Sequence, residues 1–404
     1  MAIRQRAVVT VERGFVSYTT LPTLDGRAYA LAPIGCGEYA DSKRRINMYY
    51  EQKNLFVSGT GGYHTYRIPA LVRSNDNTIL AFCEGRKFGG GDAGHIDLLL
   101  KRSFDDGDTW TDQQVVVHGN GDTSGNPAPV IDRSTGKIWL LFCRNLGDGH
   151  ESLICQGKAP RTVWLTSSED DGATWLDPKE ITTKVKLDNW TWYATGPCHG
   201  IQLRSGRLMI PCDHMVGVNL NRKTDPYHSH VIYSDDHGQR WQIGGSTQNG
   251  TNECAVVETV DGLLYLNSRN YVGEKRRVGS WSHDQGDSFQ EGAWEENLIE
   301  PVCQASLIRY TDKISYHRNR ILFSNPASMN RERMTIRISY DECRTWSNGK
   351  VLHAGPAAYS DLCLDTKQQI CCLYERGESN PYETISFDQF DLEWLTDGAD
   401  RLQP

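Results

Sequence analysis

The chain of 404 residues carries a formal net charge of −8, and its basic residues form no block longer than the Lys-Arg-Arg run at 43–45. This charge balance argues against nucleic acid or an anionic membrane surface as the main partner. No apolar run reaches the ~18 residues of a membrane-spanning helix, and the first residues lack the apolar segment of a secretory signal. No membrane insertion is therefore expected.

Residues 1–50 match no recognisable pattern and are expected to form an N-terminal extension that packs on the following domain. From residue 51 to residue 395, β-rich runs recur in one order: a short strand, a tight turn, a second strand, a longer loop, a third strand and a further turn. The first strands of six such groups begin at residues 66, 126, 200, 253, 303 and 359. Helical periodicity is absent, and residues 396–404 are expected to be a C-terminal tail.

Five turns that follow third strands share the pattern S-x-D-x-G-x-[TSR]-[WF], an Asp box, and begin at residues 103, 168, 234, 282 and 339. In such a turn Asp accepts hydrogen bonds from nearby amides, and Gly supplies a positive φ. Cys343 replaces the glycine in the last box, where a distorted turn is expected. The repeat predicts an all-β fold: a six-bladed β-propeller of four-stranded antiparallel blades.

In an antiparallel meander, the starts of first strands and the ends of second strands lie opposite the box turns. Eight polar residues are expected at that end, either there or in the adjoining loops: Arg67, Arg86, Asp92, Asn126, Glu253, Arg269, Arg331 and Tyr359. Scattered polar residues would not sort in this way, so this face is predicted to be the functional one.

Four of the eight are arginines, and three of these come from different groups: Arg67, Arg269 and Arg331. Guanidinium groups brought together repel one another, so the cluster indicates an anionic ligand with planar oxygens, such as a carboxylate. Any one of these arginines alone could instead form a surface ion pair.

Asp92 follows three glycines in KFGGGDAGH, a loop that could bring a carboxyl over a substrate, and burial is expected to raise its pKa towards that of a general acid. Tyr359 and Glu253 suit a nucleophile and its base. A neutral phenol avoids the repulsion that an anionic nucleophile meets at a carbon bearing a carboxylate. The arginines are expected to lower the pKa of Tyr359. The alternatives are a turn role for Asp92, an arginine partner for Glu253 and packing for Tyr359.

Motifs spread over residues 54–390 include YRIPAL at 66–71, EGR at 84–86, GGGD at 89–92, NPAPVID at 126–132, NEC at 252–254, NSRN at 267–270, AYSDL at 358–362 and LYERG at 373–377. Together with the five boxes, they resemble the exo-α-sialidase (neuraminidase) superfamily of glycoside hydrolases. The resemblance implies release of terminal α-linked sialic acids, N-acetylneuraminic acid or a related nonulosonic acid, from glycoproteins, glycolipids or oligosaccharides. It also implies net retention through a tyrosyl-enzyme intermediate.

By this resemblance, Arg67, Arg269 and Arg331 bind the substrate carboxylate, Asp92 is the acid/base, Tyr359 the nucleophile and Glu253 its partner. Arg331 is preferred to Arg333 because it precedes Thr335 by four residues, as in the family. The remaining residues are expected to contact the sugar or support the site: Arg86 and Asn126 on the 4-hydroxyl side, Glu84 bracing Arg67, and Trp190, Trp192 and Tyr193 walling the acyl or leaving-group side. Strand packing is the alternative for the three aromatic residues.

The same core would suit a trans-sialidase or a specialist for deaminated sialic acid (KDN), and a sialoglycan-binding propeller without catalysis is the rival of another class. Sialylated glycans are the expected partners, self-association into a homo-oligomer is left open, and no cofactor is predicted.

The His-Ser-His run at 228–230 has no third ligand at metal-site spacing and is interpreted as an exposed loop. Several of the twelve cysteines lie in apolar runs and none forms a CxxC pair, which favours a reducing, cytoplasmic compartment. A preceding signal would allow a secreted or lysosomal one.

Overall fold

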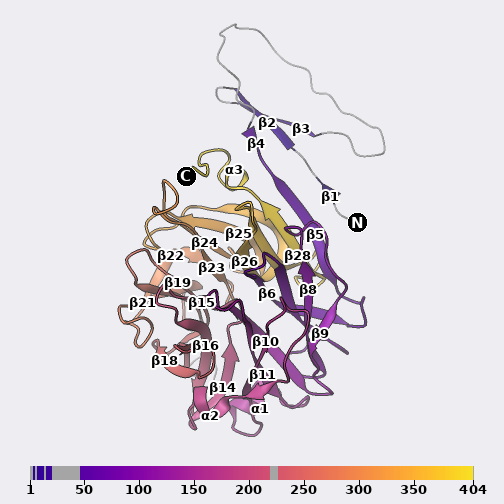
Figure 1. Cartoon of the computed structure of the whole chain (residues 1–404), viewed down its shortest axis with the longest axis vertical. Helices are drawn as coiled ribbons and strands as arrows, with labels where there is room; N and C mark the ends of the chain where they lie inside the picture. Colours follow the sequence, from indigo (N-terminus) through magenta and orange to yellow (C-terminus); the bar gives the residue numbers. More distant parts are fainter. Residues whose placement is uncertain (1–2, 5–6, 13–14, 21–45, 219–225, 404) are drawn as a thin grey trace.

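The computed structural model of the chain describes residues 3–4, 7–12, 15–20, 46–218 and 226–403. These residues form an all-β fold whose strands pair almost entirely in antiparallel order (Figure 1). In this part of the chain there are three short α-helices, α1 (Glu151–Cys155), α2 (Thr182–Val185) and α3 (Leu392–Leu395). None of the helices in the described residues has the length and apolar character to cross a membrane.

The first sheet contains two runs of consecutive strands. The first run is β6 (Thr65–Arg73), β7 (Ile79–Arg86), β8 (Ile96–Ser103) and β9 (Gln114–Val117). The second run is β10 (Thr123–Ile131), β11 (Ile138–Asn145), β12 (Thr162–Ser168) and β13 (Lys179–Glu180). A single parallel pairing, between Thr123 and Ile96, joins the two runs.

The next two sheets follow in chain order. In one, β14 (Trp190–Thr195) and β15 (Ile201–Gln202) both pair with β16 (Leu208–Val216), which is followed by β17 (Tyr227–Ser234) and β18 (Gln242–Ser246). The other consists of β19 (Thr251–Glu258), β20 (Leu264–Asn270), β21 (Arg276–Ser282) and β22 (Ala293–Ile299).

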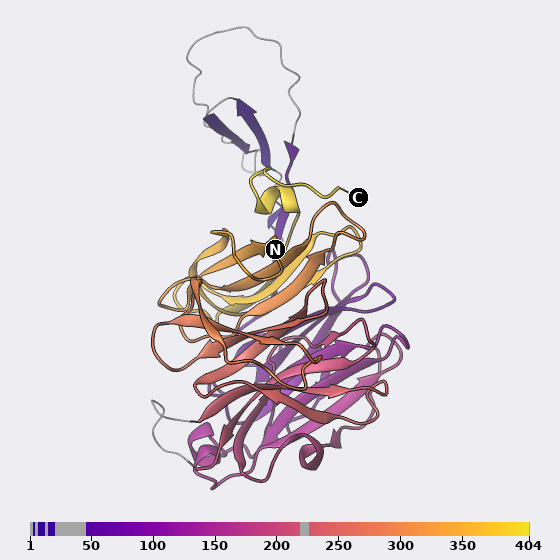
Figure 2. The same cartoon turned by 90° about the vertical axis from the view of Figure 1, so that its left-hand side faces the viewer.

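The last large sheet joins the two ends of the described chain. Its strands are β23 (Ser306–Thr311), β24 (Arg320–Pro326), β25 (Glu332–Ser339), β26 (Lys350–Leu364), β27 (Ile370–Arg376), β28 (Thr384–Phe390), β5 (Tyr50–Val57) and β1 (Ile3–Arg4). The pairing of β5 with β28 brings Val57 beside Thr384, which fastens the early chain to its end. A separate sheet of β2 (Ala7–Glu12), β3 (Phe15–Thr20) and β4 (Ile46–Asn47) lies beyond the main body (Figures 1 and 2).

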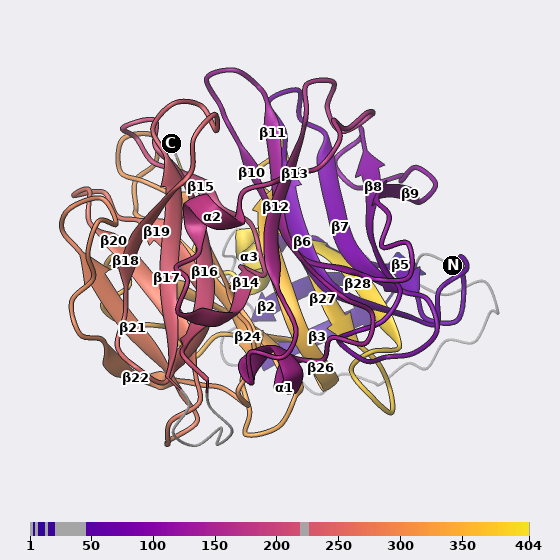
Figure 3. The ribbon, with the colours of Figure 1, turned by 90° about the horizontal axis from the view of Figure 1, so that it is seen from below.

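Most of the first strands contact the first strand of a neighbouring run in the interior of the molecule (Figure 3). Strand β6 contacts β26 and β10, β10 contacts β15, and β23 contacts both β19 and β26. Asp361 of β26 fastens this meeting point, because its Oδ2 accepts from the backbone N of Leu71 at 2.8 Å and its Oδ1 accepts from Ser306 Oγ at 2.7 Å. Strands β6, β23 and β26 therefore meet at Asp361.

The Asp boxes keep one hydrogen-bond pattern. In the first box, Gly107 has a φ of 88° and its backbone N donates to Ser103 Oγ at 2.8 Å. In the last box, Cys343 has a φ of 67° and its backbone N donates to Ser339 Oγ, also at 2.8 Å. The cysteine adopts the left-handed conformation that glycine favours, so the expected distortion of this turn is wrong.

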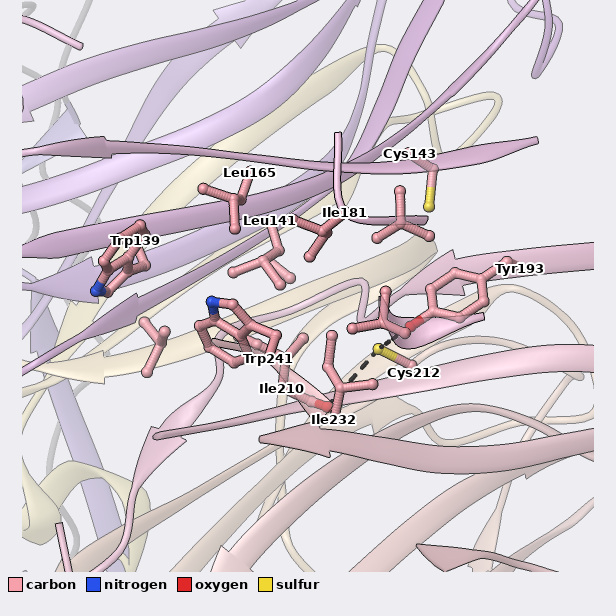
Figure 4. Close-up of a cluster of buried hydrophobic side chains, with 14 of the residues drawn as sticks. Trp139, Leu141, Cys143, Leu165, Ile181, Tyr193, Ile210, Cys212, Ile232 and Trp241 are labelled. Atoms are coloured by element: carbon pink, nitrogen blue, oxygen red, sulfur yellow. Dashed lines mark hydrogen bonds between the residues drawn. The ribbon is translucent and has the colours of Figure 1, made fainter. Parts of the chain in front are cut away.

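The apolar side chains that alternate along neighbouring strands form the core. One cluster lies between β11, β12, β16 and β17 and includes Leu141, Leu165, Ile210 and Ile232 (Figure 4). The eleven cysteines of the described part are all buried, as expected for thiols that pack as small apolar groups.

The His-Ser-His run is a second correction to the sequence analysis. It lies in β17, paired with β16, and His230 is 0% exposed. The ring of His214 stacks on Trp190 with a centroid distance of 3.5 Å, and its Nδ1 lies 3.0 Å from Nδ1 of His230. The run is therefore part of a buried aromatic stack rather than an exposed loop.

Candidate functional site

Tyr359 lies in β26 just after the strand changes its partner. Residues up to Pro356 pair with β25, whereas residues from Ala357 onward pair with β27. The Tyr359 side chain is buried, and its hydroxyl donates a hydrogen bond of 2.5 Å to Oε1 of Glu253, which lies in β19. Residues far apart in sequence thus place a phenol directly on a carboxylate.

Arg269 of β20 completes this group. Its Nη1 lies 2.5 Å from Oε2 of Glu253 and 3.0 Å from Oη of Tyr359, while its Nη2 donates to Tyr271 Oη at 3.1 Å. Its Nε is buried and has no hydrogen-bond partner among the described residues. The guanidinium therefore neutralises the carboxylate and orients the tyrosine.

The protonation state of Tyr359 differs from the expectation. Burial raises its pKa, and the Glu253 carboxylate raises it further. Arg269 and Arg331 act in the opposite direction but do not outweigh these effects, so the pKa lies well above its ordinary value. The expected lowering is wrong: the tyrosine is a neutral phenol in the free protein, and its hydroxyl donates its proton in a hydrogen bond to the Glu253 carboxylate.

Arg67 of β6 is held from behind by Glu375 of β27. The Arg67 Nε donates to Glu375 Oε1 at 2.7 Å, and the same oxygen accepts from the backbone N of Ile68 at 2.8 Å. The Arg67 guanidinium lies over the ring of Tyr382 at 4.1 Å and over that of Tyr359 at 5.2 Å. One edge of Arg67 is thus fixed, while the group faces the nucleophile candidate.

Arg331 lies on the other side of the same tyrosine. Its guanidinium is 5.5 Å from the centre of the Tyr359 ring, and its Nη1 donates to Tyr382 Oη at 2.8 Å. Arg333, two residues further, is exposed and has a φ of 62°. The structure therefore brings Arg331 together with Arg67 and Arg269 around Tyr359.

Asp92 lies in the loop between β7 and β8, and its side chain is 77% exposed. Its Oδ1 is 2.7 Å from Nη1 of Arg86 and 3.8 Å from Nη1 of Arg67. Desolvation raises the pKa of this carboxyl, but Arg86 and Arg67 outweigh that effect and lower the pKa below its ordinary value. The expected burial and raised pKa are therefore wrong for the free protein.

Glu84 supports Arg86 and not Arg67. Its Oε2 accepts from Nη2 of Arg86 at 2.7 Å, and its Oε1 accepts from the backbone N of Asn126 at 2.9 Å. Asn126 has a φ of 57°, and its Oδ1 accepts from Nη2 of Arg161 at 2.5 Å. The predicted brace is thus corrected: Glu375 holds Arg67, while Glu84 links Arg86 to Asn126.

The predicted aromatic wall divides into two parts. Trp190 and Tyr193 are both buried in one core cluster. Tyr193, labelled in Figure 4, is 0% exposed, and its hydroxyl donates a hydrogen bond to Cys212 Sγ. Their expected role as pocket walls is wrong, and strand packing explains them. Trp192 is partly buried, lies under the Arg161 guanidinium at 4.2 Å and donates from Nε1 to Asp213 at 3.0 Å.

Three residues of the site were missed from the sequence: Glu375, Tyr382 and Arg161. Glu375 belongs to the LYERG motif at 373–377, so the motif could have identified it as a site residue. Arg161 opens the third strand of its group, and Tyr382 lies in a loop without a pattern. In the described residues no group of three or more His, Cys, Asp or Glu side chains could hold a metal ion.

The chain matches one known protein family and is similar in sequence to proteins named as sialidases. Residues 77–372 match the BNR repeat-like domain. An exo-alpha-sialidase of Aspergillus fumigatus is 32% identical, with 83% of this chain and 86% of the relative covered. Sialidase-3 of Mus musculus is also 32% identical, with 81% of this chain and 91% of the relative covered.

A solved structure shares the fold. The Hadza microbial sialidase Hz136 has a TM-score of 0.75 and 28% identity, and the alignment covers 89% of this chain and 71% of that one. The sequence alignments thus cover most of the length of a fungal relative and of an animal relative. The chain belongs to the sialidase family of BNR repeat-like proteins.

Proposed function

We propose that this protein is an exo-α-sialidase that releases terminal α-linked sialic acids from glycans with net retention. The observation that carries the proposal is the contact of 2.5 Å between the Tyr359 hydroxyl and the Glu253 carboxylate, beside Arg269. The fungal and murine relatives are named as sialidases, which supports the same activity. A neutral nucleophile suits a sugar whose reacting carbon carries a carboxylate.

The scaffold we propose is a propeller of six four-stranded blades that spans residues 51–395. The first four blades are the consecutive runs β6–β9, β10–β13, β14–β18 and β19–β22. The fifth and sixth share β26, whose first part pairs with β25 and whose second part pairs with β27, and β5 closes the sixth. Residues 1–50 and 396–404 then lie outside the catalytic propeller.

In this proposal, the substrate carboxylate lies among Arg67, Arg269 and Arg331. Each guanidinium presents N–H donors in one plane and can form charge-assisted hydrogen bonds with a carboxylate oxygen. Glu375 and Glu253 fix two of the three and leave their other edges for the ligand. Arg86, Asn126 and Trp192 would contact the sugar further from the reacting carbon, with Glu84 and Arg161 as their supports.

The first step forms a bond between Tyr359 Oη and the anomeric carbon. As it forms, Glu253 takes the phenolic proton, and the bond from the anomeric carbon to the leaving oxygen breaks. Asp92 gives its proton to that oxygen. Asp92 must first become protonated, and substrate binding favours this, because the sugar carboxylate competes for Arg67 and the sugar excludes water from the loop.

The second step reverses these roles. Asp92, now a carboxylate, takes a proton from water as the water oxygen attacks the anomeric carbon. The bond to Tyr359 breaks, and Glu253 returns the proton to the phenolate. Two inversions at one carbon give retention, so the first product is the α anomer.

Incubation with sialyllactoses that carry acetylated, glycolylated or deaminated sialic acid tests the proposal. Time-resolved NMR is expected to show free α-sialic acid first, followed by mutarotation. Transfer to added lactose would favour a trans-sialidase, and release confined to the deaminated sugar a specialist for that sugar. Binding without any product would support the non-catalytic alternative, and a β anomer appearing first would exclude the tyrosyl intermediate.

A further inference from the structure

A second cavity, of about 350 Å³, opens where the first strands run on beyond the Tyr359 site. It is lined by Leu71 of β6 and Val257 of β19, each four residues after a member of that site. At about 3.3 Å per residue, this displacement is about 13 Å along the strands. A volume of this size lies in the range of small-molecule sites.

A hydrogen-bonded pair of His199 and Asp361 lies at this cavity, and Asp361 stands two residues after Tyr359 in β26. His199, which lines the cavity, has its Nδ1 2.7 Å from Oδ1 of Asp361. Oδ2 of Asp361 accepts from the backbone N of His199 at 3.0 Å, and the carboxylate is fully buried. In the part of the chain that the structure describes, Nε2 of His199 has no hydrogen-bond partner.

The cavity lining contains both apolar and charged side chains. The wall residues come from four first strands: Leu71, Val257, Leu307 and Leu362. Four arginines and two carboxylates line the cavity, an excess of two positive charges in a chain whose net charge is −8. The cavity lining therefore combines apolar side chains with an excess of positive charge.

Two of the four arginines are neutralised by partners and two are not. Arg204 lies 3.3 Å from Glu258, and Arg309 forms an ion pair with Glu342. For Arg73 and Arg133, the described residues offer neither an ion pair nor a hydrogen bond to the guanidinium.

Arg73 also disfavours the charged form of Arg133. Desolvation, together with repulsion from Arg73, lowers the pKa of the Arg133 guanidinium. An anion between the two groups would remove the repulsion and supply the missing acceptors.

We propose that this cavity binds an organic monocarboxylate with a short apolar chain. The carboxylate lies between the guanidiniums of Arg73 and Arg133, and the chain packs on the leucine and valine walls. The charge excess selects an anion, and the walls select against a fully hydrated one such as inorganic phosphate. This site is separate from the proposed catalytic one and does not depend on its activity.

The test is a ligand-observed NMR titration of the full chain with hexanoate, and with 1-hexanol and hexylamine as neutral and cationic probes of the same length. Hexanoate is expected to bind about tenfold or more tightly than either probe, because only its carboxylate can form charge-assisted hydrogen bonds with the two guanidiniums. Arg73→Met and Arg133→Met are each expected to weaken hexanoate binding about tenfold and to leave hexanol binding unchanged.

Arg331→Met is the matched control, because it removes an arginine from the Tyr359 site and should leave hexanoate binding at Arg73 and Arg133 as in the unmodified chain. Loss of hexanoate binding in Arg331→Met, equal binding of hexanoate and hexanol, or no binding of hexanoate at all would each overturn the proposal. If the methionine variants do not fold, the three-probe comparison on the unmodified chain and a crystal soaked with hexanoate still decide it. Hexanoate seated anywhere other than between Arg73 and Arg133 in that crystal contradicts the proposal.

Discussion

Glu375 and Arg67 form a buried ion pair that links Arg67 of β6 to β26, the strand that carries Tyr359. Oε1 of Glu375 accepts from Nε of Arg67 at 2.7 Å, and Oε2 of the same carboxylate accepts from the backbone N of Tyr359 at 3.1 Å. The Glu375 side chain is 0% exposed and that of Arg67 7% exposed. One carboxylate therefore sets the position of an arginine and of the tyrosine beside it.

Replacing this carboxylate by an amide should affect binding and stability together. Glu375→Gln leaves Arg67 with a neutral partner, and removing one partner of a buried pair costs about 3–5 kcal/mol of unfolding free energy. We expect a loss near 3 kcal/mol, measured by urea unfolding, and a rise in KM of about tenfold. Glu378→Gln, at an exposed position in the following loop, is the control and should change neither. Unchanged KM in Glu375→Gln would contradict the bracing role.

Arg331 and Arg333 offer a matched pair two residues apart. Arg331 faces the Tyr359 ring and is bonded to Tyr382, whereas Arg333 is exposed. Arg331→Met is expected to raise KM for a sialoside by about two orders of magnitude, because it removes a charge-assisted contact to the substrate carboxylate. Arg333→Met should leave KM within about two-fold. The reverse result would assign the carboxylate contact to Arg333.

Asp92 and Glu253 can be distinguished by the leaving group. A 4-nitrophenyl leaving group departs as a stable anion and needs little protonation, so Asp92→Asn should lose far less activity on an aryl sialoside than on sialyllactose. Glu253→Gln impairs the nucleophile itself and should lose about 10²–10⁴-fold on both substrates. Equal losses in the two variants on both substrates would refute the division between acid and base.

The arginine beside Asp92 should set the pH dependence. Arg86 and Arg67 lower the pKa of the Asp92 carboxyl, and the first step needs that carboxyl protonated. The rate constant kcat/KM should therefore fall as pH rises through this pKa. Removing the cation in Arg86→Met raises the pKa and should move the basic limb of the profile upward by about one pH unit. Arg86→Lys keeps a cation and should move it less; a limb that stays in place or moves downward would argue against Asp92.

Much of the fold could be predicted because each strand group repeats a local pattern. The first strands predicted at residues 66, 126, 253 and 303 correspond to β6, β10, β19 and β23. The closing pair β5 and β28 was not predicted, since no local pattern links Val57 to Thr384. Cys343 shows a related limit: the surrounding bonds hold the turn in the conformation that the missing glycine would favour.

The candidate site, like the fold, could be predicted only in part from the sequence. Topology alone places Tyr359, Glu253 and the arginines at one end, and they do meet there. Their charge states could not be read from residue types, because the pKa of Asp92 depends on whether Arg86 or solvent lies beside it. The side chains of β14 alternate between its two faces, so Tyr193 faces the core and Trp192 faces the other side. Pairing with β16 fixes this register, and the sequence of β14 alone does not.

The most direct measurement is the identification of the residue that becomes glycosylated. The protein is incubated with 2,3-difluorosialic acid, whose 3-fluorine slows both steps and whose 2-fluoride leaves without protonation; it is then quenched with acid, digested and analysed by mass spectrometry. We predict a fluorosialyl adduct on Tyr359, in the peptide that contains GPAAYSDL, and none in Tyr359→Phe protein of the same thermal stability. An adduct on the Glu253 carboxylate, or an adduct that persists in Tyr359→Phe, would contradict the tyrosyl mechanism.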